Sequence, residues 1–413
     1  MAAVLITVLI LRGPNGDRVL VAPRANHHTI ATRVVRGRAQ LYDARTGRAF
    51  VPRGANYVRL ARLRDVGGSQ IDYHATFNVG RYDARRAEHA LASMQALGYN
   101  TVRVFLDAVC VDGCLASTDG LSRAYVANLV DFLRRADAHH MLVMLTLDFL
   151  PTFGRYAALL RQGESRDVSG PNAAFLTSAG RAAEASFWQG LVSALVRAKA
   201  PLRAILAYEL RNELAYSATD PPLTLRTGTF RTPDGKRWNL AISLQRRRML
   251  AAATVAWLDE TRAAIRRVDP TALVGVGFAD AKQGDALQRR LVRAVVARSS
   301  ADVVDVHLYP TKGRSLGARA RALGLSLLPT KVLLLGEFGA FRERYPSAAA
   351  AATALRGWQA AACSYGFSGW LLWTWNTKEQ PELWAATDRD LVIGRALAPL
   401  RLRTCAARRM KRR

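Results

Sequence analysis

Eight short apolar runs alternate with amphipathic stretches along this 413-residue chain, and this rhythm leaves few folds open. Each run is typical of a strand buried on both faces, as in a parallel sheet. Strict alternation of strand and helix predicts such a sheet, and eight units favour closure into a (β/α)8 TIM barrel over an open doubly wound sheet. No Gly-rich fingerprint follows the first run, which argues against a dinucleotide fold. The predicted strands are Ala55–Leu60, Thr101–Leu106, Leu142–Leu147, Ala204–Glu209, Leu273–Phe278, Val303–His307, Val332–Leu335 and Gly369–Trp373.

Helices are predicted between these strands, together with two decorations. The segment "RVVRGRAQLYDARTGRAFVPRG" predicts an N-terminal β-hairpin that turns at "DARTG", and "TLRTGTFRTPDGKRW" predicts an insertion after the fourth strand. Neither a linker nor a repeat divides the rest, so we expect one barrel over residues 33–400, preceded by a segment 1–32 and followed by a basic tail 401–413. The predicted helices are Ala84–Leu97, Ser122–Ala138, Ala173–Ala198, Gln245–Val268, Gln283–Arg298 and Ser347–Ser364.

The N-terminus and the cysteines bear on the compartment. The opening "MAAVLITVLIL" is too short to cross a bilayer of roughly 30 Å as a helix, and no other segment has transmembrane length. It reads either as the apolar part of a secretory signal or as a first strand. Cys110 could pair with Cys114, and Cys363 with Cys405, in an oxidising compartment, or all four could be buried free thiols. We expect a secreted or cell-envelope protein, with the cytoplasm as the alternative.

The net charge of +28 and the pI near 11.1 suggest an anionic partner at first sight. Only seven of the 60 basic residues are Lys, and the Arg residues are spread over nearly every predicted helix. They form no stripe interleaved with aromatic residues, which a groove for single-stranded nucleic acid requires. We therefore expect no specific nucleic-acid partner, and binding to an anionic envelope polymer rests on charge alone. A monomer is expected.

Polar and aromatic residues gather at the carboxyl ends of the predicted strands, where barrel active sites lie. Two of them, Glu213 and Glu337, are carboxylates. Such a pair can split a glycosidic bond, one attacking the anomeric carbon while the other protonates the departing oxygen, and a separation of about 5–5.5 Å implies a covalent intermediate. Arg103 is expected to keep Glu337 ionised, while Glu213 is expected in a drier place where it holds a proton. The strand-end residues are Asn56, Tyr57, Arg103, Asp107, Asp148, Asn212, Glu213, His307, Tyr309, Glu337, Trp373, Trp375 and Asn376.

Six segments in this order, "RGANYVRL", "YNTVRVF", "YELRNE", "VDVHLYP", "LLLGEFG" and "GWLLWTWN", resemble the family 5 (cellulase-like) glycoside hydrolases. The resemblance implies retaining hydrolysis of a β-linked glycan or glycoside without metal or cofactor, with Glu213 as acid/base and Glu337 as nucleophile. The alternative is a catalytically silent barrel that binds carbohydrate. Two departures leave the sugar open: "LTLDFLP" has Asp148 and Phe149 where many members have a histidine, and Leu214 replaces the usual proline.

The same resemblance implies roles for the supporting residues. Asn212 would bind the sugar 2-hydroxyl and Trp373 would form the platform beneath the reacting sugar. Tyr309 would donate a hydrogen bond to the nucleophile, His307 would lie near the acid/base, and Arg103 would orient the nucleophile. Cleft walls would come from Asn56, Tyr57 and Trp375.

Several residues have a structural reading instead. Glu209 lies deeper than Glu213 on the same strand, where an ion pair with an arginine is expected rather than catalysis. Alternation would turn Asn212 and Glu213 to opposite sides, so the chain must leave regular strand geometry there. His74 is expected to serve packing or the surface. Trp188 and Trp257 are expected in the core, whereas Trp238 and Trp384 could extend the cleft.

Overall fold

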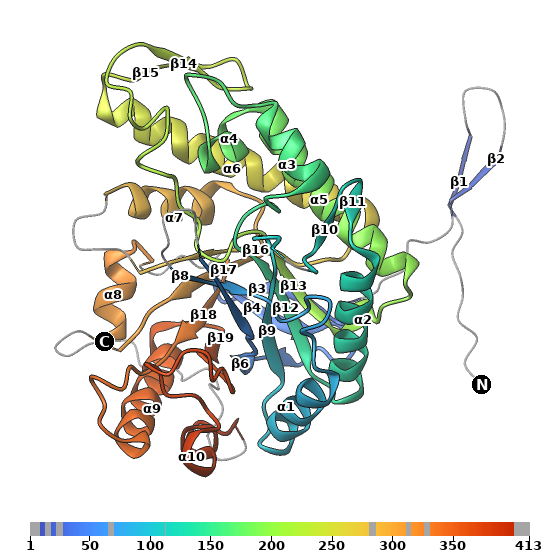
Figure 1. Cartoon of the computed structure of the whole chain (residues 1–413), viewed down its shortest axis with the longest axis vertical. Coiled ribbons are helices and arrows are strands. Elements are labelled where there is room, and N and C mark those ends of the chain that lie inside the picture. The colour runs from blue at the N-terminus through green and yellow to red at the C-terminus, as the bar shows by residue number, and fades with distance from the viewer. Residues whose placement is uncertain are drawn as a thin grey trace.

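A computed structural model of the chain contains the expected closed parallel barrel (Figure 1). Each strand pairs in parallel with the next along the chain, and the last pairs back to the first through Trp370 and Arg53. The predicted (β/α)8 barrel is therefore confirmed. The barrel strands are β6 (Arg53–Asn56), β9 (Thr101–Leu106), β12 (Leu142–Leu147), β13 (Ile205–Glu209), β16 (Val274–Phe278), β17 (Val303–His307), β18 (Val332–Phe338) and β19 (Gly369–Leu372). The structure describes residues 9–12, 18–21, 28–64, 70–111, 113–280, 286–310, 315–325 and 331–399.

Helices follow the strands and surround the barrel (Figure 1). The predicted single helix Ala173–Ala198 is wrong, because Thr177 has extended backbone (φ −120°, ψ 153°) and its side-chain oxygen instead caps the second helix by accepting from the Gly180 N–H. The helices are α1 (Ala84–Ala96), α2 (Arg123–Ala138), α3 (Gly154–Arg161), α4 (Pro171–Leu176), α5 (Ser178–Arg197), α6 (Ser243–Val268), α7 (Ala286–Arg298), α8 (Leu316–Ala322), α9 (Ala348–Tyr365) and α10 (Asp388–Ala396).

The first barrel strand is shorter than the apolar run that predicted it. The run Ala55–Leu60 was expected as one strand, but β6 ends at Asn56 and Leu60 already begins β7 (Leu60–Arg64), which pairs with β8 (Gln70–His74) in an antiparallel hairpin. Apolar character continues through the point where the chain leaves the barrel, so hydrophobicity alone could not locate the strand end.

A small N-terminal sheet closes the lower end of the barrel, where the strands begin. Strands β3 (Ile30–Val35), β4 (Arg38–Asp43) and β5 (Ala49–Phe50) pair in that order, which confirms the hairpin at "DARTG" and adds a strand before it. Ile30 and Leu41 pack on apolar side chains of the barrel interior such as Met144 and Leu334. The lower half of the interior is thus sealed by apolar contact.

Alternation along the strands divides the barrel into two environments. In β9, Val102, Val104 and Leu106 face the helices and belong to the large core, whereas Arg103 and Phe105 point inward.

The predicted insertion after the fourth strand is also present, as the hairpin β14 (Thr229–Arg231) and β15 (Arg237–Asn239). Its turn at "PDG" has Gly235 in the left-handed region (φ +82°).

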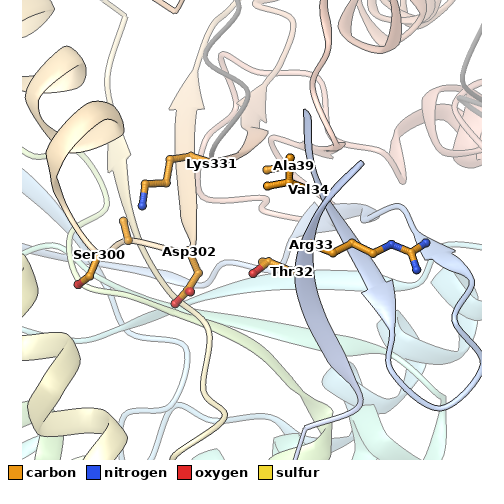
Figure 2. Close-up of a pocket in the computed structure, with 8 residues that line it drawn as sticks. Thr32, Arg33, Val34, Ala39, Ser300, Asp302 and Lys331 are labelled. Carbon is orange, nitrogen blue, oxygen red and sulfur yellow. The ribbon is translucent and has the colours of Figure 1, made fainter. Parts of the chain in front are cut away.

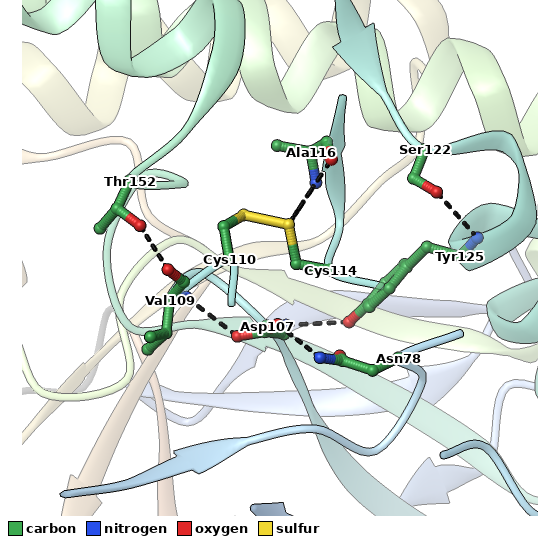
Figure 3. Close-up of a disulfide and its surroundings, with 9 residues drawn as sticks. All are labelled: Asn78, Asp107, Val109, Cys110, Cys114, Ala116, Ser122, Tyr125 and Thr152. Atoms are coloured by element: carbon green, nitrogen blue, oxygen red, sulfur yellow. Dashed lines mark hydrogen bonds between the residues drawn. A yellow bond between two sulfur atoms is a disulfide. The ribbon is translucent and has the colours of Figure 1, made fainter. Parts of the chain in front are cut away.

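A disulfide joins Cys110 to Cys114 in the loop after β9, as one of the two alternatives for these cysteines predicted (Figure 3). The loop is anchored to the next one, since the Thr152 N–H donates to the Ala108 carbonyl over 2.9 Å. Two short strands, β10 (Ala116–Ser117) and β11 (Gly120–Leu121), follow it before α2. The predicted Cys363–Cys405 bridge involves Cys405, which lies outside the described residues.

The chain termini are described only in part. Near the N-terminus β1 (Leu9–Arg12) pairs antiparallel with β2 (Arg18–Val21), so part of the opening apolar segment is strand. The basic tail 401–413 lies outside the described residues. No helix in the described part of the chain combines the length and the apolar character that a membrane span needs.

Candidate active site

Glu213 and Glu337 come together at the carboxyl end of the barrel. Glu337 lies within β18 and its side chain is only 6% exposed, whereas Glu213 follows the end of β13 and its side chain is 42% exposed. One carboxyl oxygen of each and a ring nitrogen of His307 all lie within 4.8 Å of one another. The structure therefore brings together two acids that are far apart in the sequence.

Irregular backbone after β13 makes this meeting possible. The strand ends at Glu209, and beyond it the Asn212 N–H donates to the Leu147 carbonyl of β12, while the Arg211 carbonyl accepts from the Gly277 N–H of β16. The expected break in alternation is therefore present. Gly277 is required beside it, since a Cβ there would lie 1.9 Å from the Asn212 carbonyl oxygen.

Three side chains contact the Glu337 carboxylate. Arg103 Nη1 donates to Oε1 and the Tyr309 hydroxyl donates to Oε2, each over 2.8 Å, and His307 Nδ1 lies 3.5 Å from Oε1. Both carboxylate oxygens are thus held, and the orientation of the group is fixed.

Arg103 organises the layer beneath the two carboxylates. Its guanidinium also donates to Glu209 (2.8 Å), to Asn212 Oδ1 (2.6 Å) and to Asn56 Oδ1 (3.0 Å). The expected structural ion pair of Glu209 is confirmed, and both residues are fully buried. The expectation that Asn56 forms a cleft wall is wrong: the residue is fully buried, and its amide nitrogen donates to the carbonyls of Gly336 and Leu372.

His307 links the two working carboxylates to a deeper one. Its Nδ1 hydrogen bonds with Glu213 Oε1 over 2.8 Å, and its Nε2 lies 3.5 Å from Oδ2 of Asp305. Burial alone would lower the pKa of His307, but the negative charge of Glu337 and the contacts with Asp305 and Glu213 raise it to about 10. These acidic neighbours therefore favour the imidazolium form of the ring.

The environments of the two acids are the reverse of what we expected. Glu337 is the drier one: burial raises its pKa and the charge of Glu213 adds to this, against the opposing charges of His307 and Arg103. For Glu213 burial also acts to raise the pKa, but the hydrogen bond and charge of His307 prevail and lower it. Burial is thus the cause for Glu337 and His307 the cause for Glu213, and the charge of a histidine could not be inferred from the sequence.

The predicted aromatic walls divide between the site and the core. Trp373 follows β19, packs edge-on against Phe105 at 5.6 Å between ring centres, and lies beside Tyr309, since both approach Gly339. Tyr57 and Trp375 were expected to line the cleft, and this is wrong. Both are buried among the helices, because alternation turns Tyr57 away from its inward neighbour Asn56, and Trp375 packs edge-on against Tyr99.

The burial and contacts of the remaining tryptophans show whether each lies in the core or at the surface. Trp188 and Trp257 are fully buried, as expected. Trp384 does not extend a cleft: its ring is buried under Arg342, 3.9 Å away, and its indole N–H donates to the Tyr345 carbonyl. Trp238 lies half-buried on the β15 strand and donates to Thr232.

Sequence reasoning missed His74 as a neighbour of this site. It stacks on Phe105, with 3.7 Å between ring centres, and its Nε2 lies 3.3 Å from Asp148 Oδ2. The signal available was the departure at Asp148, because a carboxylate in place of the usual histidine indicates a different polar neighbour. Beyond it Phe149 and Phe153 are 39% and 50% exposed.

The described residues also line hollows away from the carboxylate pair. One of about 380 Å³ lies beside Phe153 and Arg155 at the start of α3. Another, of about 360 Å³, lies between the N-terminal sheet and the starts of β17 and β18, at the opposite end of the barrel (Figure 2). It is lined by Thr32, Arg33, Val34, Ala39, Ser300, Ala301, Asp302 and Lys331.

Comparison with known proteins identifies the fold. No protein-family model matches the sequence, and no curated protein matches it. Among solved structures, the endo-1,4-β-mannanase of Rhizomucor miehei has a TM-score of 0.58 at 15% identity, over 89% of this chain and 98% of that one. The β-mannanase of the blue mussel Mytilus edulis has a TM-score of 0.53 at 17% identity, over 90% of this chain and 96% of that one.

A third structure carries the family name. The glycoside hydrolase family 5 mannosidase of Rhizomucor miehei has a TM-score of 0.53 at 13% identity, over 91% of this chain and 98% of that one. The expected resemblance to family 5 is therefore confirmed for the fold. This chain has the barrel that these glycosidases share.

Proposed function

We propose that this protein is a retaining glycoside hydrolase that cleaves a β-glycosidic bond by double displacement, with Glu337 as nucleophile and Glu213 as acid/base. The observation that carries the proposal is the approach of their carboxyl oxygens to within 4.8 Å at the carboxyl end of the barrel. A pair that close leaves no space for a water between the Glu337 carboxylate and the anomeric carbon, so this carboxylate attacks the carbon itself.

The contacts of each acid support its role. Arg103 and Tyr309 hold both oxygens of Glu337, which fixes a lone pair for attack and balances its charge. Glu213 is the more exposed acid and lies where a leaving group can reach it. Asn212 Oδ1 accepts a hydrogen bond from Arg103, which leaves the amide nitrogen free to donate to the sugar 2-hydroxyl.

Substrate binding would complete the protonation pattern. In the free protein Glu213 is ionised, because its pKa is lowered by His307. A sugar that covers its exposed face removes water from the carboxylate, and desolvation favours the neutral acid. The acid would thus be protonated when the leaving group is in place.

The choice of sugar rests on the fold neighbours and on exposed apolar residues. Because structures with this fold include mannanases, β-mannosides and β-mannans belong first in a substrate panel, beside glucosides and xylosides. Phe149 and Phe153 offer exposed ring faces of the kind that pack on the apolar side of a pyranose. The Cys110–Cys114 disulfide supports export to an oxidising compartment.

The purified protein, tested on aryl β-glycosides, should hydrolyse at least one of them. Glu337→Ala and Glu213→Ala should each lower turnover by about 10³-fold or more, on the scale seen when a member of a catalytic unit is removed. A 2-fluoro sugar with a good leaving group should label the peptide that contains Glu337. Glu343→Ala, at an exposed acid that pairs with Arg344, serves as control. A loss of a few-fold in either variant, or a label elsewhere, would refute the assignment.

A further inference from the structure

A second layer of ionisable groups lies directly beneath the two working carboxylates. Glu209, Asp305 and His307 are at most 1% exposed, and one polar atom of each lies within 4.8 Å of the others. The double displacement uses neither Glu209 nor Asp305. Glu209 pairs closely with Arg103, whereas the charged neighbours of Asp305 lie 3.5 and 3.6 Å away, so the burial of Asp305 calls for an explanation, because buried charges are costly unless closely paired.

Asp305 is placed by its strand to face the ring of His307. The two residues are two positions apart in β17, so both point into the barrel. Asp305 Oδ2 lies 3.5 Å from His307 Nε2 and 3.6 Å from Arg103 Nε. The neighbouring strand leaves room for it, since a Cβ on Gly336 would lie 1.8 Å from Oδ2 of Asp305.

The charges of the cluster do not balance unless one carboxyl group is protonated. Around His307 lie Asp305 on its own strand, Glu209 and Glu213 from the β13 side, Glu337 on β18 and Arg103 on β9. Glu213 is 42% exposed, so water screens its charge. The three buried carboxylates face one guanidinium and one imidazole, so even with a charged imidazole one negative charge is left over.

Glu209 and Asp305 are placed to share such a proton, since one carboxyl oxygen of each lies within 4.8 Å of the other. Both oxygens of Asp305, Oε1 of Glu209 and Nε2 of His307 have no well-aligned hydrogen-bond partner among the described residues. A proton on Glu209 gives the two carboxyl groups one hydrogen bond. In agreement, burial and the charge of Asp305 raise the pKa of Glu209 to about 8, while contacts with His307 and Glu209 lower the pKa of Asp305.

We propose that Asp305, hydrogen-bonded by the protonated carboxyl group of Glu209, is a positioning residue that holds His307 as an imidazolium, and that His307 supplies the proton with which Glu213 acts. The geometry that supports this proposal is that Asp305 lies at Nε2 of the His307 ring and Glu213 lies at Nδ1 of the same ring. The last part of this proposal rests on the proposed function.

The proton transfer is balanced within the cluster. When substrate covers Glu213, the Nδ1–H bond of His307 breaks and an O–H bond forms on Glu213, so an imidazolium and a carboxylate become an imidazole and a carboxylic acid. Glu213 gives this proton to the leaving oxygen. In the second displacement it takes a proton from the attacking water, which can return to His307 and restore the starting state.

A divalent metal is the competing occupant of the Glu209, Asp305 and His307 cluster. The guanidinium of Arg103, 2.8 Å from Glu209 and 3.6 Å from Asp305, already places a fixed positive charge among these atoms. A second cation there would meet strong repulsion in a region of low dielectric. We therefore favour protons as the balancing charge, and the test below includes the metal.

The ring of His307 can be followed directly by NMR of the protein labelled with ¹⁵N-histidine, with His307→Gln identifying its signals. In the parent protein these signals should remain those of an imidazolium up to at least pH 8. Asp305→Asn should lower the pH of the transition by about one to three units, the usual effect of removing a close opposite charge. Glu209→Gln, which keeps a neutral donor, should move it by less than half as much. Asp302→Asn, on the same segment but paired with Arg262 and Arg266 elsewhere, should leave it unchanged.

This readout needs no activity, so it separates the proposal from the proposed function. A neutral His307 ring at pH 7 in the parent protein would overturn the proposal even if Asp305→Asn failed to fold. An unshifted transition in folded Asp305→Asn would do the same, as would a Glu209→Gln shift equal to that of Asp305→Asn. A change of the His307 signals on treatment with EDTA would favour the metal and also overturn it. If the protein hydrolyses a glycoside, the alkaline limb of kcat/KM should fall in Asp305→Asn by the same one to three units.

Discussion

Arg103 and Glu337 meet through a 2.8 Å hydrogen bond in a place where the first side chain is fully buried and the second nearly so. Removing one partner of such a pair leaves an uncompensated charge in a dry region, which is strongly destabilising. The same guanidinium holds Asn56, Glu209 and Asn212, so its planar shape matters as much as its charge. A lysine could replace the charge but not these directions.

We predict that Arg103→Lys lowers kcat/KM by about 10²-fold, because a displacement of a reacting group by about 1 Å has costs on this scale. Steady-state kinetics on the best aryl glycoside of the panel would measure it. Arg62→Lys, at an exposed pair with Asp72, should change nothing and controls for the substitution itself. Near-parent activity in Arg103→Lys would show that orientation of Glu337 does not depend on the guanidinium fork.

Tyr309→Phe tests the second donor to Glu337. The hydroxyl lowers the pKa of Glu337 by its hydrogen bond, so its loss raises that pKa further. A hydrogen bond to a charged group contributes about 1.5–3 kcal/mol, so the acid limb of the kcat/KM profile should move to higher pH by about one to two units. Tyr42→Phe, on the N-terminal sheet, is the control. An acid limb at its original pH would mean that Glu337 does not set it.

How far the sequence predicted the molecule depended on the kind of feature. Strand positions were predictable because burial on both faces leaves apolar runs such as Thr101–Leu106, and β9 has these bounds. The end of the first strand was not, because Val58 is as apolar as Ala55 although the chain has already left the barrel. Local hydrophobicity reports burial, not which layer a residue is buried in.

The sequence predicted which residues form the site better than it predicted the burial and the charge of those residues. Residues at strand ends had to converge, and Glu213, His307 and Glu337 do so. Tyr57 and Trp375 were wrongly expected in the cleft, because the side of the barrel wall on which a side chain lies depends on where the regular alternation of the strand stops. The reversal of the two acid environments had two other causes: burial raises the pKa of Glu337, and His307 lowers the pKa of Glu213. Strand-end positions predict neither the burial of one acid nor the charge of a neighbouring histidine.

The close approach of Gly336 to Asp305 predicts a sharp contrast between two glycines. A Cβ at position 336 would lie 1.8 Å from the Asp305 carboxylate, so Gly336→Ala should lower the free energy of unfolding by about 3 kcal/mol or more. Gly357 lies inside α9 with nothing near its missing Cβ, so Gly357→Ala should raise that free energy by about 0.5–1 kcal/mol. Urea unfolding measures both. Equal effects would mean that the space around Asp305 is not as tight as described.

The Cys110–Cys114 disulfide closes a short loop beside the site. In the chain-entropy model a loop of this length stabilises the folded state by about 2 kcal/mol, so the double variant Cys110→Ser/Cys114→Ser should lose about that amount of unfolding free energy. Dithiothreitol should destabilise the parent protein by at least this amount and the double variant by less, because the variant has already lost this bridge. A parent protein that is indifferent to the reductant would contradict a structural role for the bridge.

The buried cluster finally predicts a loss of stability at alkaline pH. The folded-state pKa of Glu209 is raised, chiefly by burial, from 4.5 to about 8. Its contribution to the free energy of unfolding is therefore fully present below pH 4.5 and is lost as pH rises through 8. The pKa of His307 is raised by its acidic neighbours, against burial, to about 10, so its contribution is full below pH 6.5 and is lost as pH rises through 10. Urea unfolding at intervals from pH 6 to 10 should show a continuous fall. Glu209→Gln cannot lose a proton at this position, so between pH 6.5 and 8 its stability should fall less steeply than that of the parent protein, while above pH 8 the two curves should run parallel. Parallel curves below pH 8 as well would mean that Glu209 is already ionised at neutral pH, and the charge balance argued for the cluster would not hold.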